Sequence, residues 1–228
     1  LWNINEKATA YFERTLRHAS KGKAGRDYLN DRSISRETII EFRLGYAPDE
    51  WGGLVGILRD HKLDLDMAVQ AGVIIPKKNG GYYDRFRGRI IFPIFDLRQQ
   101  VVGFGGRVLD NSLPKYVNTP ETPVFHKGEC LYGLHASYKA IRDKGRAVIV
   151  EGYMDWLELK SQGLDEVAVR THVADGPSAP PEAALNALQK RGFLFQAKKK
   201  RGAKPLYIPE ELGEILQNFL WDEEKDIY

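Results

Sequence analysis

Two carboxylates, Glu151 and Asp155, stand within the run AVIVEGYMD at residues 147–155. The β-branched residues before Glu151 favour a strand, Gly152 turns the chain, and Asp155 falls in the first turn of the expected next helix. Because sites in parallel α/β sheets form beyond the carboxyl ends of strands, both side chains can point into one crevice. Such oxygen ligands suit Mg²⁺ that is shared with phosphate groups. The alternative is that Asp155 stabilises the helix N-terminus and that Glu151 is solvated.

Basic side chains alternate in the run YDRFRGR at residues 83–89. On an extended chain, Arg85, Arg87 and Arg89 face the same way, roughly 6.6 Å apart. A row of guanidinium groups at this spacing can follow a polyphosphate or the backbone of a single-stranded nucleic acid. The alternative is a solvated strand face with structural ion pairs.

Further basic side chains come from separate loops. Arg107 follows the glycine-rich run GFGG, and Lys115 and Lys127 lie in a long stretch that is rich in proline and polar residues. Glycines allow a ligand to approach the backbone closely, and a loop of this length within a compact domain is usually functional. We expect these cations to bind phosphate groups, whereas His126 is expected to be structural.

Residues 5–60 are predicted to be mainly helical. Ala8 and Phe12 belong to an apolar pattern at helical spacing, which places them on one face. Gly22 and Gly25 are expected to break the first helix, and a short second helix is expected to begin at Gly25. Ser35 is expected to be the N-cap of a third.

From residue 82 the pattern changes. Residues 90–95 and 101–104 are β-branched and aromatic, and a polar segment separates them, which predicts a hairpin. Pro93 indicates an edge position or an irregularity in the first strand. Helix and strand patterns alternate with short connections over residues 136–170, which predicts a parallel α/β unit.

Composition limits the class of protein. The chain has 228 residues, 43% of them hydrophobic, a formal net charge of +3 and a single cysteine, Cys130. One cysteine excludes an internal disulfide and a Cys-rich zinc site, and it favours a reducing cytoplasm. No apolar run approaches the roughly 20 residues of a membrane helix, so no membrane partner is expected. The first residue is not methionine, which indicates a fragment of a longer protein.

Together, and in this order, the motifs resemble the bacterial DNA primase family over about residues 8–169. The matching segments are Tyr28-Leu29, GYAP at 45–48 with Trp51, YDRFR at 83–87, FPI at 92–94, GFGGRV at 103–108, PKYVNTPET at 114–122, FHKG at 125–128, LYGL at 131–134 and EGYMD at 151–155. The resemblance implies an RNA-polymerase core that makes short RNA primers on single-stranded DNA for replication. The alternative is a catalytically impaired protein of primase origin that binds nucleic acid or nucleotides.

The resemblance also implies an architecture. We expect an α+β N-terminal subdomain at residues 1–134, a partial α/β Toprim-like domain at 135–175 and a divergent helix–hairpin–helix tail, similar to a winged helix, at 176–228. The family continues into an Asp-x-Asp motif, whereas here Asp175-Gly176 is followed by Pro177. The Toprim part is therefore expected to be shortened.

Site residues and partners follow from the same resemblance. Glu151 and Asp155 match the catalytic acids and expected ligands of Mg²⁺ or Mn²⁺, with Asp175 as a weaker third candidate ligand. The residues expected to bind nucleotides and template are Arg32, Arg85, Arg87, Arg107, Lys115, Asn118 and Lys127. Expected partners are single-stranded DNA and ribonucleoside triphosphates. A replicative helicase is expected for the family, but its interaction domain is not recognisable in this sequence.

Overall fold

The computed structural model describes residues 1–127, 130–144, 147–150 and 152–170. The chain divides into two compact units, with the boundary between His126 and Lys127. The predicted tail at residues 176–228 lies outside the described residues, and the division into three domains stays a prediction. Within the described ranges, no helix is long and apolar enough to cross a membrane.

The first unit is built on a four-stranded antiparallel sheet in the order β1-β4-β5-β6. The strands are β1 (Gly45–Ala47), β4 (Arg89–Phe95), β5 (Val101–Val108) and β6 (Tyr116–Asn118). The pairing of β4 with β5 confirms the predicted hairpin. Since β1 pairs only with residues 89–91, Pro93 lies beyond the end of β1, beside a register shift at Ile94/Phe95. Proline has no backbone N–H to donate, and because β1 does not reach Pro93, no hydrogen bond to β1 is lost there.

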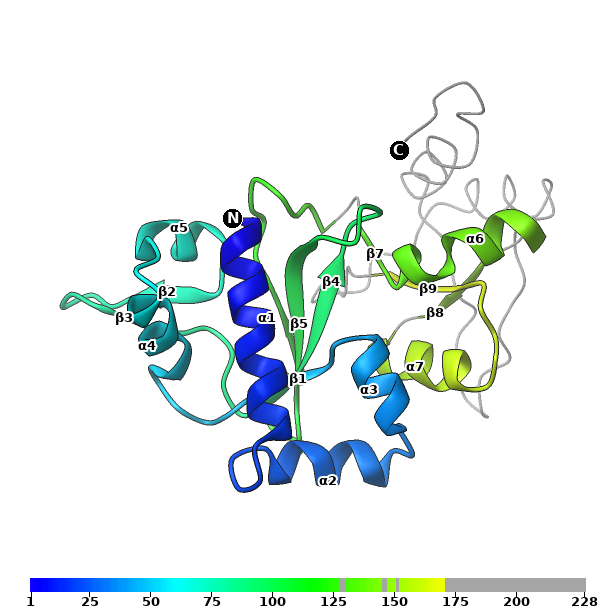
Figure 1. Cartoon of the computed structure of the whole chain (residues 1–228), viewed down its shortest axis with the longest axis horizontal. Helices are drawn as coiled ribbons and strands as arrows, with labels where there is room; N and C mark the ends of the chain where they lie inside the picture. The colour runs from blue at the N-terminus through cyan, green and yellow to red at the C-terminus, as the bar shows by residue number, and fades with distance from the viewer. Residues whose placement is uncertain (128–129, 145–146, 151, 171–228) are drawn as a thin grey trace. The chain divides into compact units, whose positions relative to one another are not determined.

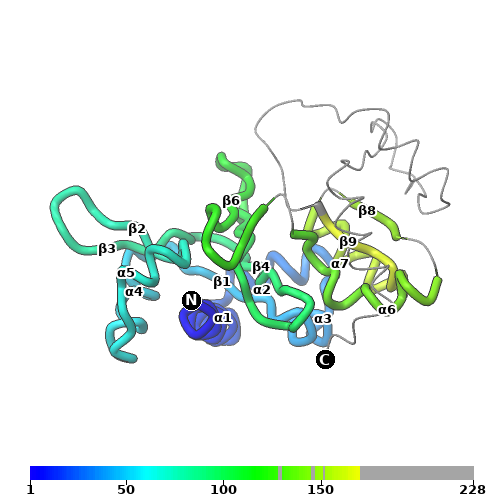
Figure 2. The backbone as a smooth tube through the Cα atoms, turned by 90° about the horizontal axis from the view of Figure 1, so that it is seen from above, coloured from blue at the N-terminus to red at the C-terminus, as the bar shows by residue number. Residues whose placement is uncertain are grey.

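Helix α1 (Trp2–Arg17) lies along one face of this sheet, as Figures 1 and 2 together show. The predicted apolar face is confirmed, because Ala8 and Phe12 are buried. The Phe12 ring meets Phe86 and Phe104 edge to face, with ring centroids 6.3 Å and 5.7 Å apart. Glycine at position 45 permits this packing, because a Cβ there would lie 2.4 Å from Cβ of Phe12. The core of the unit therefore sits between α1 and the sheet.

The predicted second helix is confirmed as α2 (Lys23–Asp31), with Gly22 as its N-cap, but Gly25 lies inside this helix rather than in the break before it. A Cβ on Gly25 would lie 2.9 Å from the Tyr46 ring, so the glycine is used for close packing. The break lies before α2, where the Arg26 guanidinium donates to the carbonyl groups of Leu16, His18 and Ala19, each at 2.6 Å. These bonds satisfy carbonyls that a helix end leaves without partners.

Helix α3 (Arg36–Glu41) begins at its predicted cap. The Ser35 hydroxyl accepts a hydrogen bond from the Thr38 backbone N–H at 3.1 Å. We expect Ser35→Ala to lower the free energy of unfolding by about 1 kcal/mol, because that N–H loses its partner. Urea unfolding measures the change, and Ser35→Asn should restore the stability since asparagine also caps helices. Equal stability of the alanine variant and the native chain would contradict the expectation.

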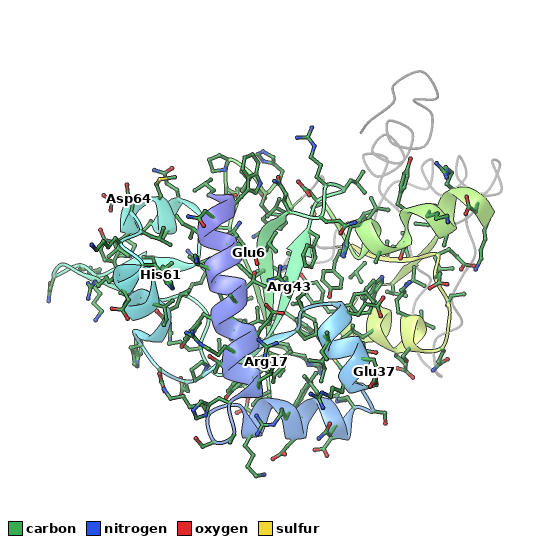
Figure 3. The ribbon with its side chains drawn as sticks, viewed as in Figure 1. Glu6, Arg17, Glu37, Arg43, His61 and Asp64 are labelled. Atoms are coloured by element: carbon green, nitrogen blue, oxygen red, sulfur yellow. The ribbon has the colours of Figure 1, made fainter. Side chains whose placement is uncertain are left out.

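An ion pair fastens the turn after α3 to α1. The Arg43 guanidinium donates to both carboxylate oxygens of Glu6, at 3.0 Å and 2.6 Å, and to Glu13 at 3.0 Å (Figure 3). The hydrogen bonds from Arg43 lower the pKa of the Glu6 carboxyl. This bidentate contact fixes the chain where it enters β1.

The rest of the first unit extends from the sheet as two short helices and a hairpin (Figures 1 and 2). These are α4 (Gly53–Asp60), α5 (Leu65–Gln70), β2 (Ile74–Pro76) and β3 (Tyr82–Asp84). Gly72, with φ of +70°, follows α5 and its C-cap Ala71, in the left-handed conformation with which helices commonly end.

The described part of the second unit is a three-stranded sheet in the order β7-β9-β8. Its elements are β7 (Leu131–Tyr132), α6 (Leu134–Lys144), β8 (Val148–Val150), α7 (Tyr153–Ser161) and β9 (Val167–Arg170). Strands β8 and β9 are parallel and α7 connects them, which confirms the predicted parallel α/β unit. The buried Trp156 ring donates to the Val167 carbonyl at 2.7 Å and ties α7 to β9.

Candidate nucleic-acid interface

Two of the predicted basic residues meet at one tyrosine. The guanidinium carbon of Arg32, which follows α2, lies 5.2 Å from the centre of the Tyr28 ring, and that of Arg107 on β5 lies 5.7 Å from it. Arg107 also lies 5.1 Å from the Tyr116 ring on β6 and donates to the Tyr116 hydroxyl. We call Tyr28, Arg32, Arg107 and Tyr116 the Tyr28 cluster. It brings together residues that are far apart in the sequence.

The pairing of β5 with β6 places a further predicted residue beside this cluster. Arg107 is opposite Tyr116, and Asn118 is opposite Gly105. Side chains two positions apart on a strand share a face, so Arg107, Tyr116 and Asn118 lie on the same face of the sheet. Glycine at position 105 adds no side chain to that face.

Arg107 has hydrogen-bonding capacity to spare. Arg107 is only 7% exposed, yet its Nε has no hydrogen-bond partner among the described residues. The buried hydroxyl of Tyr28 also has no hydrogen-bond partner among them. A buried donor without a partner carries a free-energy cost, and a buried cation without a counter-charge carries a larger one. Such an arrangement is suited to an acceptor that carries negative charge.

Arg87 lies against two aromatic rings whose own centroids are 5.4 Å apart. Its guanidinium carbon lies 4.1 Å from the centre of the Trp51 ring and 5.4 Å from that of Tyr83. We call these three residues the Trp51 stack. Trp51 is 61% exposed, which is unusual for so large an apolar side chain. An exposed aromatic ring beside a guanidinium group is the combination on which unpaired bases stack.

The alternate arginines do not form the row that their spacing predicts. Residues 85–88 lie between β3 and β4 rather than in a strand, and Gly88 has φ of +59°, so the alternation of an extended chain is lost. The Arg85 Nε is buried without a partner among the described residues. Burial lowers the pKa of Arg85 and of Arg89.

Arg89 is a structural residue. It is 9% exposed, and its guanidinium donates to the Pro114 carbonyl at 3.0 Å and, at 3.4 Å each, to those of Gly106 and Lys115. These bonds hold the segment that leads into β6. Of the two interpretations of Arg89, the structural one is therefore correct, although its partners are carbonyl groups rather than carboxylates.

The remaining basic residues have different settings. Lys115 is exposed at the start of β6, and Lys127, in the second unit, is half-buried. His126 contacts the Glu121 carboxylate at 3.2 Å, within its own loop. Sequence reasoning missed Thr119, whose buried hydroxyl accepts from the Phe104 N–H at 2.9 Å and anchors the end of β6 on β5.

Sequence reasoning also missed the role of the tyrosines. Tyr28, Tyr83 and Tyr116 supply the rings on which the arginines lie. A signal was available for one of them, because Tyr28 and Arg32 are four residues apart, the spacing at which helix residues are neighbours.

Of the three predicted metal ligands, only Asp155 is described. It lies exposed in the first turn of α7, directly beyond β8, as predicted. Its Oδ2 lies 2.9 Å from the position that a Cβ on Gly152 would take, so glycine lets the carboxylate lean over the turn. This setting fits a metal ligand. Glu151 and Asp175 lie outside the described residues. Among the residues that the structure describes, no group of three His, Cys, Asp or Glu side chains could hold a metal ion.

Comparisons with known proteins agree on one family. The family model for the N-terminal domain of the DNA primase catalytic core matches residues 11–138. The DNA primase of Pseudomonas putida is 37% identical over 231 aligned positions, which cover 92% of this chain and 35% of that protein. The DNA primase of Deinococcus radiodurans is 46% identical over 165 aligned positions, which cover 72% of this chain and 28% of that protein. The chain thus spans about a third of the length of these relatives.

The alignment with the Pseudomonas putida primase bears on the predicted divergent tail. Residues 1–175 make up about three quarters of the 228 residues, whereas the alignment covers 92% of the chain. Part of the segment at 176–228 therefore aligns with a primase as well.

Solved structures give the same result. The DnaG primase catalytic domain bound to single-stranded DNA has a TM-score of 0.68 at 33% identity and covers 82% of this chain and 59% of its own. A DNA primase domain from Pseudomonas aeruginosa has a TM-score of 0.69 at 35% identity, with 82% and 58% covered. The matched family model covers more than half of the sequence, and the mixed helix and sheet fold is that of the primase catalytic core. The chain therefore belongs to the DNA primase family.

Proposed function

We propose that this chain is the RNA-polymerising core of a DNA primase and synthesises short RNA primers on single-stranded DNA. Family membership supports the proposal, and so does the binding of single-stranded DNA by a solved relative. The observation that carries it is the Tyr28 cluster. Arg107 is almost fully buried, and its Nε has no hydrogen-bond partner in the part of the chain that the structure describes, a setting that favours a negatively charged acceptor such as a phosphate group.

The first unit would bind template and nucleotides. Arg32 and Arg107 would contact phosphate groups, with Asn118 on the same face and Lys115 beside it. The Trp51 stack would hold an unpaired base against its ring, because every base offers a flat face to an aromatic side chain. Arg85, whose buried Nε has no hydrogen-bond partner among the described residues, would add positive charge for the ribonucleoside triphosphates. Lys127, the first residue of the second unit, is a further candidate for nucleotide binding.

The second unit would carry the reaction site, as a shortened Toprim domain at 135–175. Asp155 would hold Mg²⁺ or Mn²⁺ together with Glu151, and Asp175 is the candidate for a further ligand. A bound divalent metal supplies charge that stabilises the attacking oxygen and the leaving pyrophosphate. The same family membership supports a cytoplasmic replication protein that works with a helicase.

Primer synthesis on single-stranded DNA tests the proposal. Labelled ribonucleotides, Mg²⁺ or Mn²⁺ and the full chain should give short RNA products that require the template. Product would mean a working core. Absence of product, with salt-sensitive binding of single-stranded DNA retained, would mean that the chain binds nucleic acid without polymerising. Absence of both would overturn the proposal.

The Trp51 stack gives a separate expectation. Trp51→Ala should weaken the binding of single-stranded DNA about tenfold, since stacking of one base contributes roughly 1–3 kcal/mol. Fluorescence anisotropy of a labelled oligodeoxynucleotide measures the affinity. The dependence on salt concentration should stay the same, because tryptophan neutralises no phosphate.

The matched control is Trp2→Ala, since Trp2 is also exposed, at 49%, but stands at the start of α1. Equal losses in the two variants would contradict a role for the Trp51 stack.

A further inference from the structure

We infer that Asp84 is a positioning residue that fixes the Trp51 ring and the Arg87 guanidinium relative to each other. The inference rests on the proposed binding of template at the Trp51 stack. Asp84 would not contact a bound base itself. It would act through the backbone segments that carry Trp51 and Arg87.

Each polar group of Asp84 is engaged close to the stack. Its carboxylate accepts from the backbone N–H groups of Leu54, at 2.8 Å, and Val55, at 3.0 Å. Its own N–H donates to the Trp51 carbonyl at 3.0 Å, and its carbonyl accepts from the Arg87 guanidinium. The residue is 4% exposed. Asp84 therefore joins the two segments that supply the two halves of the stack.

The turn that carries Trp51 also packs against helix α1. The Tyr11 hydroxyl of α1 lies 2.2 Å from the position that a Cβ on Gly53 would take, so only glycine fits there. Burial, with the charges of Asp84 and Glu50, raises the pKa of Tyr11 to about 12, so this hydroxyl is protonated at neutral pH. The backbone from Trp51 to Leu54 is thus held between α1 and β3.

Helix capping alone does not account for the arrangement. Most helices take their cap from the residue just before them, as α5 does with Asp64, which accepts from the N–H groups of Asp66 and Met67. At α4 the N-cap is Gly52, which offers no side chain, and the carboxylate comes instead from the end of β3. A local cap would stabilise α4 equally well. Only a cap from β3 also ties Trp51 to Arg87.

Position 52 makes the two roles separable. A Cβ on Gly52 would meet nothing within 4 Å, and its φ of −151° is negative, so position 52 can carry a side chain. With ψ turned from 17° to the extended value usual at an N-cap, an aspartate there caps α4 from its own chain. Combining Gly52→Asp with Asp84→Ala restores the cap without restoring the side-chain tie to β3.

The test uses the full chain labelled with 5-fluorotryptophan, and its four tryptophans give four ¹⁹F resonances. The Trp51 resonance is assigned by its loss in Trp51→Phe. In Asp84→Ala, and equally in the Gly52→Asp/Asp84→Ala variant, it should move towards its position in the unfolded chain while the other three stay in place. Asp64→Ala, the matched helix-cap control, removes the cap of α5 and should leave it unchanged. A Trp51 resonance that returns to its native position in the double variant would overturn the inference, because Asp84 would then only cap α4.

Binding of a labelled oligodeoxynucleotide separates this inference from the proposed function. We expect both Asp84 variants to bind about fivefold more weakly than the native chain, and adding Trp51→Ala should bring the loss only to the roughly tenfold that Trp51→Ala causes alone, because the two changes act through one ring. A displaced Trp51 resonance in a chain whose native form does not bind single-stranded DNA would overturn the proposed function and leave the positioning role standing. A further loss on adding Trp51→Ala, equal to its effect in the native chain, would overturn the positioning role alone.

Discussion

Glu151→Gln should lower the rate of RNA primer synthesis by about a thousandfold, because a charged metal ligand contributes several kcal/mol to stabilising the charge of the reaction. Glutamine keeps the size of the side chain but loses its negative charge. The variant should bind single-stranded DNA as the native chain does. The measurement is product formed per unit time with labelled ribonucleotides over a series of Mg²⁺ and Mn²⁺ concentrations.

The matched control for this substitution is Glu158→Gln. Glu158 is exposed on α7, in the same unit as the predicted ligands, and its removal should leave the rate unchanged. A Glu151→Gln variant that retains native activity would show that the carboxylate is not part of the reaction site. Loss of activity together with loss of template binding would indicate a damaged fold, which thermal unfolding reports separately.

Arg107→Ala should weaken the binding of single-stranded DNA about a hundredfold, since hydrogen bonds to a charged group contribute roughly 1.5–3 kcal/mol each. The slope of the logarithm of affinity against the logarithm of salt concentration should fall by about 0.7, as for the loss of one phosphate contact on a single strand. Arg107→Lys should recover only part of the loss, because lysine keeps the charge without the planar fork of donors.

Arg98→Ala is the control for charge alone. Arg98 is exposed in the turn between β4 and β5, so its removal changes the net charge by the same amount outside the Tyr28 cluster. Equal losses for Arg98→Ala and Arg107→Ala would mean that the overall positive charge, rather than the cluster, binds the strand. A native salt slope in Arg107→Ala would exclude a phosphate contact by this residue.

Sequence patterns predicted the longer elements of the fold because burial repeats with a clear period. The spacing of Ala8 and Phe12 located α1, and the Ser35 cap located α3. The short strands β1, β2, β3 and β6 were not predicted, because three residues are too few to show an alternation. The break before α2 was predicted correctly at Gly22, whereas Gly25 lies inside α2, because a glycine that breaks a helix and one that lets an aromatic ring approach it look the same in a sequence.

The candidate interface was predicted as a set of residue types but not as an arrangement. Arg107 was named from its place after the glycine-rich run and Arg32 from the resemblance to primases, whereas the tyrosine that brings them together depends on how α2 packs against the sheet. The alternation of Arg85, Arg87 and Arg89 gave a wrong picture, because it assumed an extended chain where Gly88 turns it. Contacts between distant segments follow from packing, which no local pattern encodes.

The carboxylate of Asp84 at the start of α4 has an electrostatic consequence for the surface around Trp51. The amino end of a helix normally attracts anions, because its dipole is positive there and its first N–H groups point outward. At α4 an internal anion already takes two of those groups, so this end offers little to a phosphate. A strand crossing Trp51 can thus have its charge neutralised there by Arg87 but not by the helix. Contact at this point then depends on the flat face of a base more than on the sugar–phosphate chain, and it should tolerate an uncharged methylphosphonate linkage.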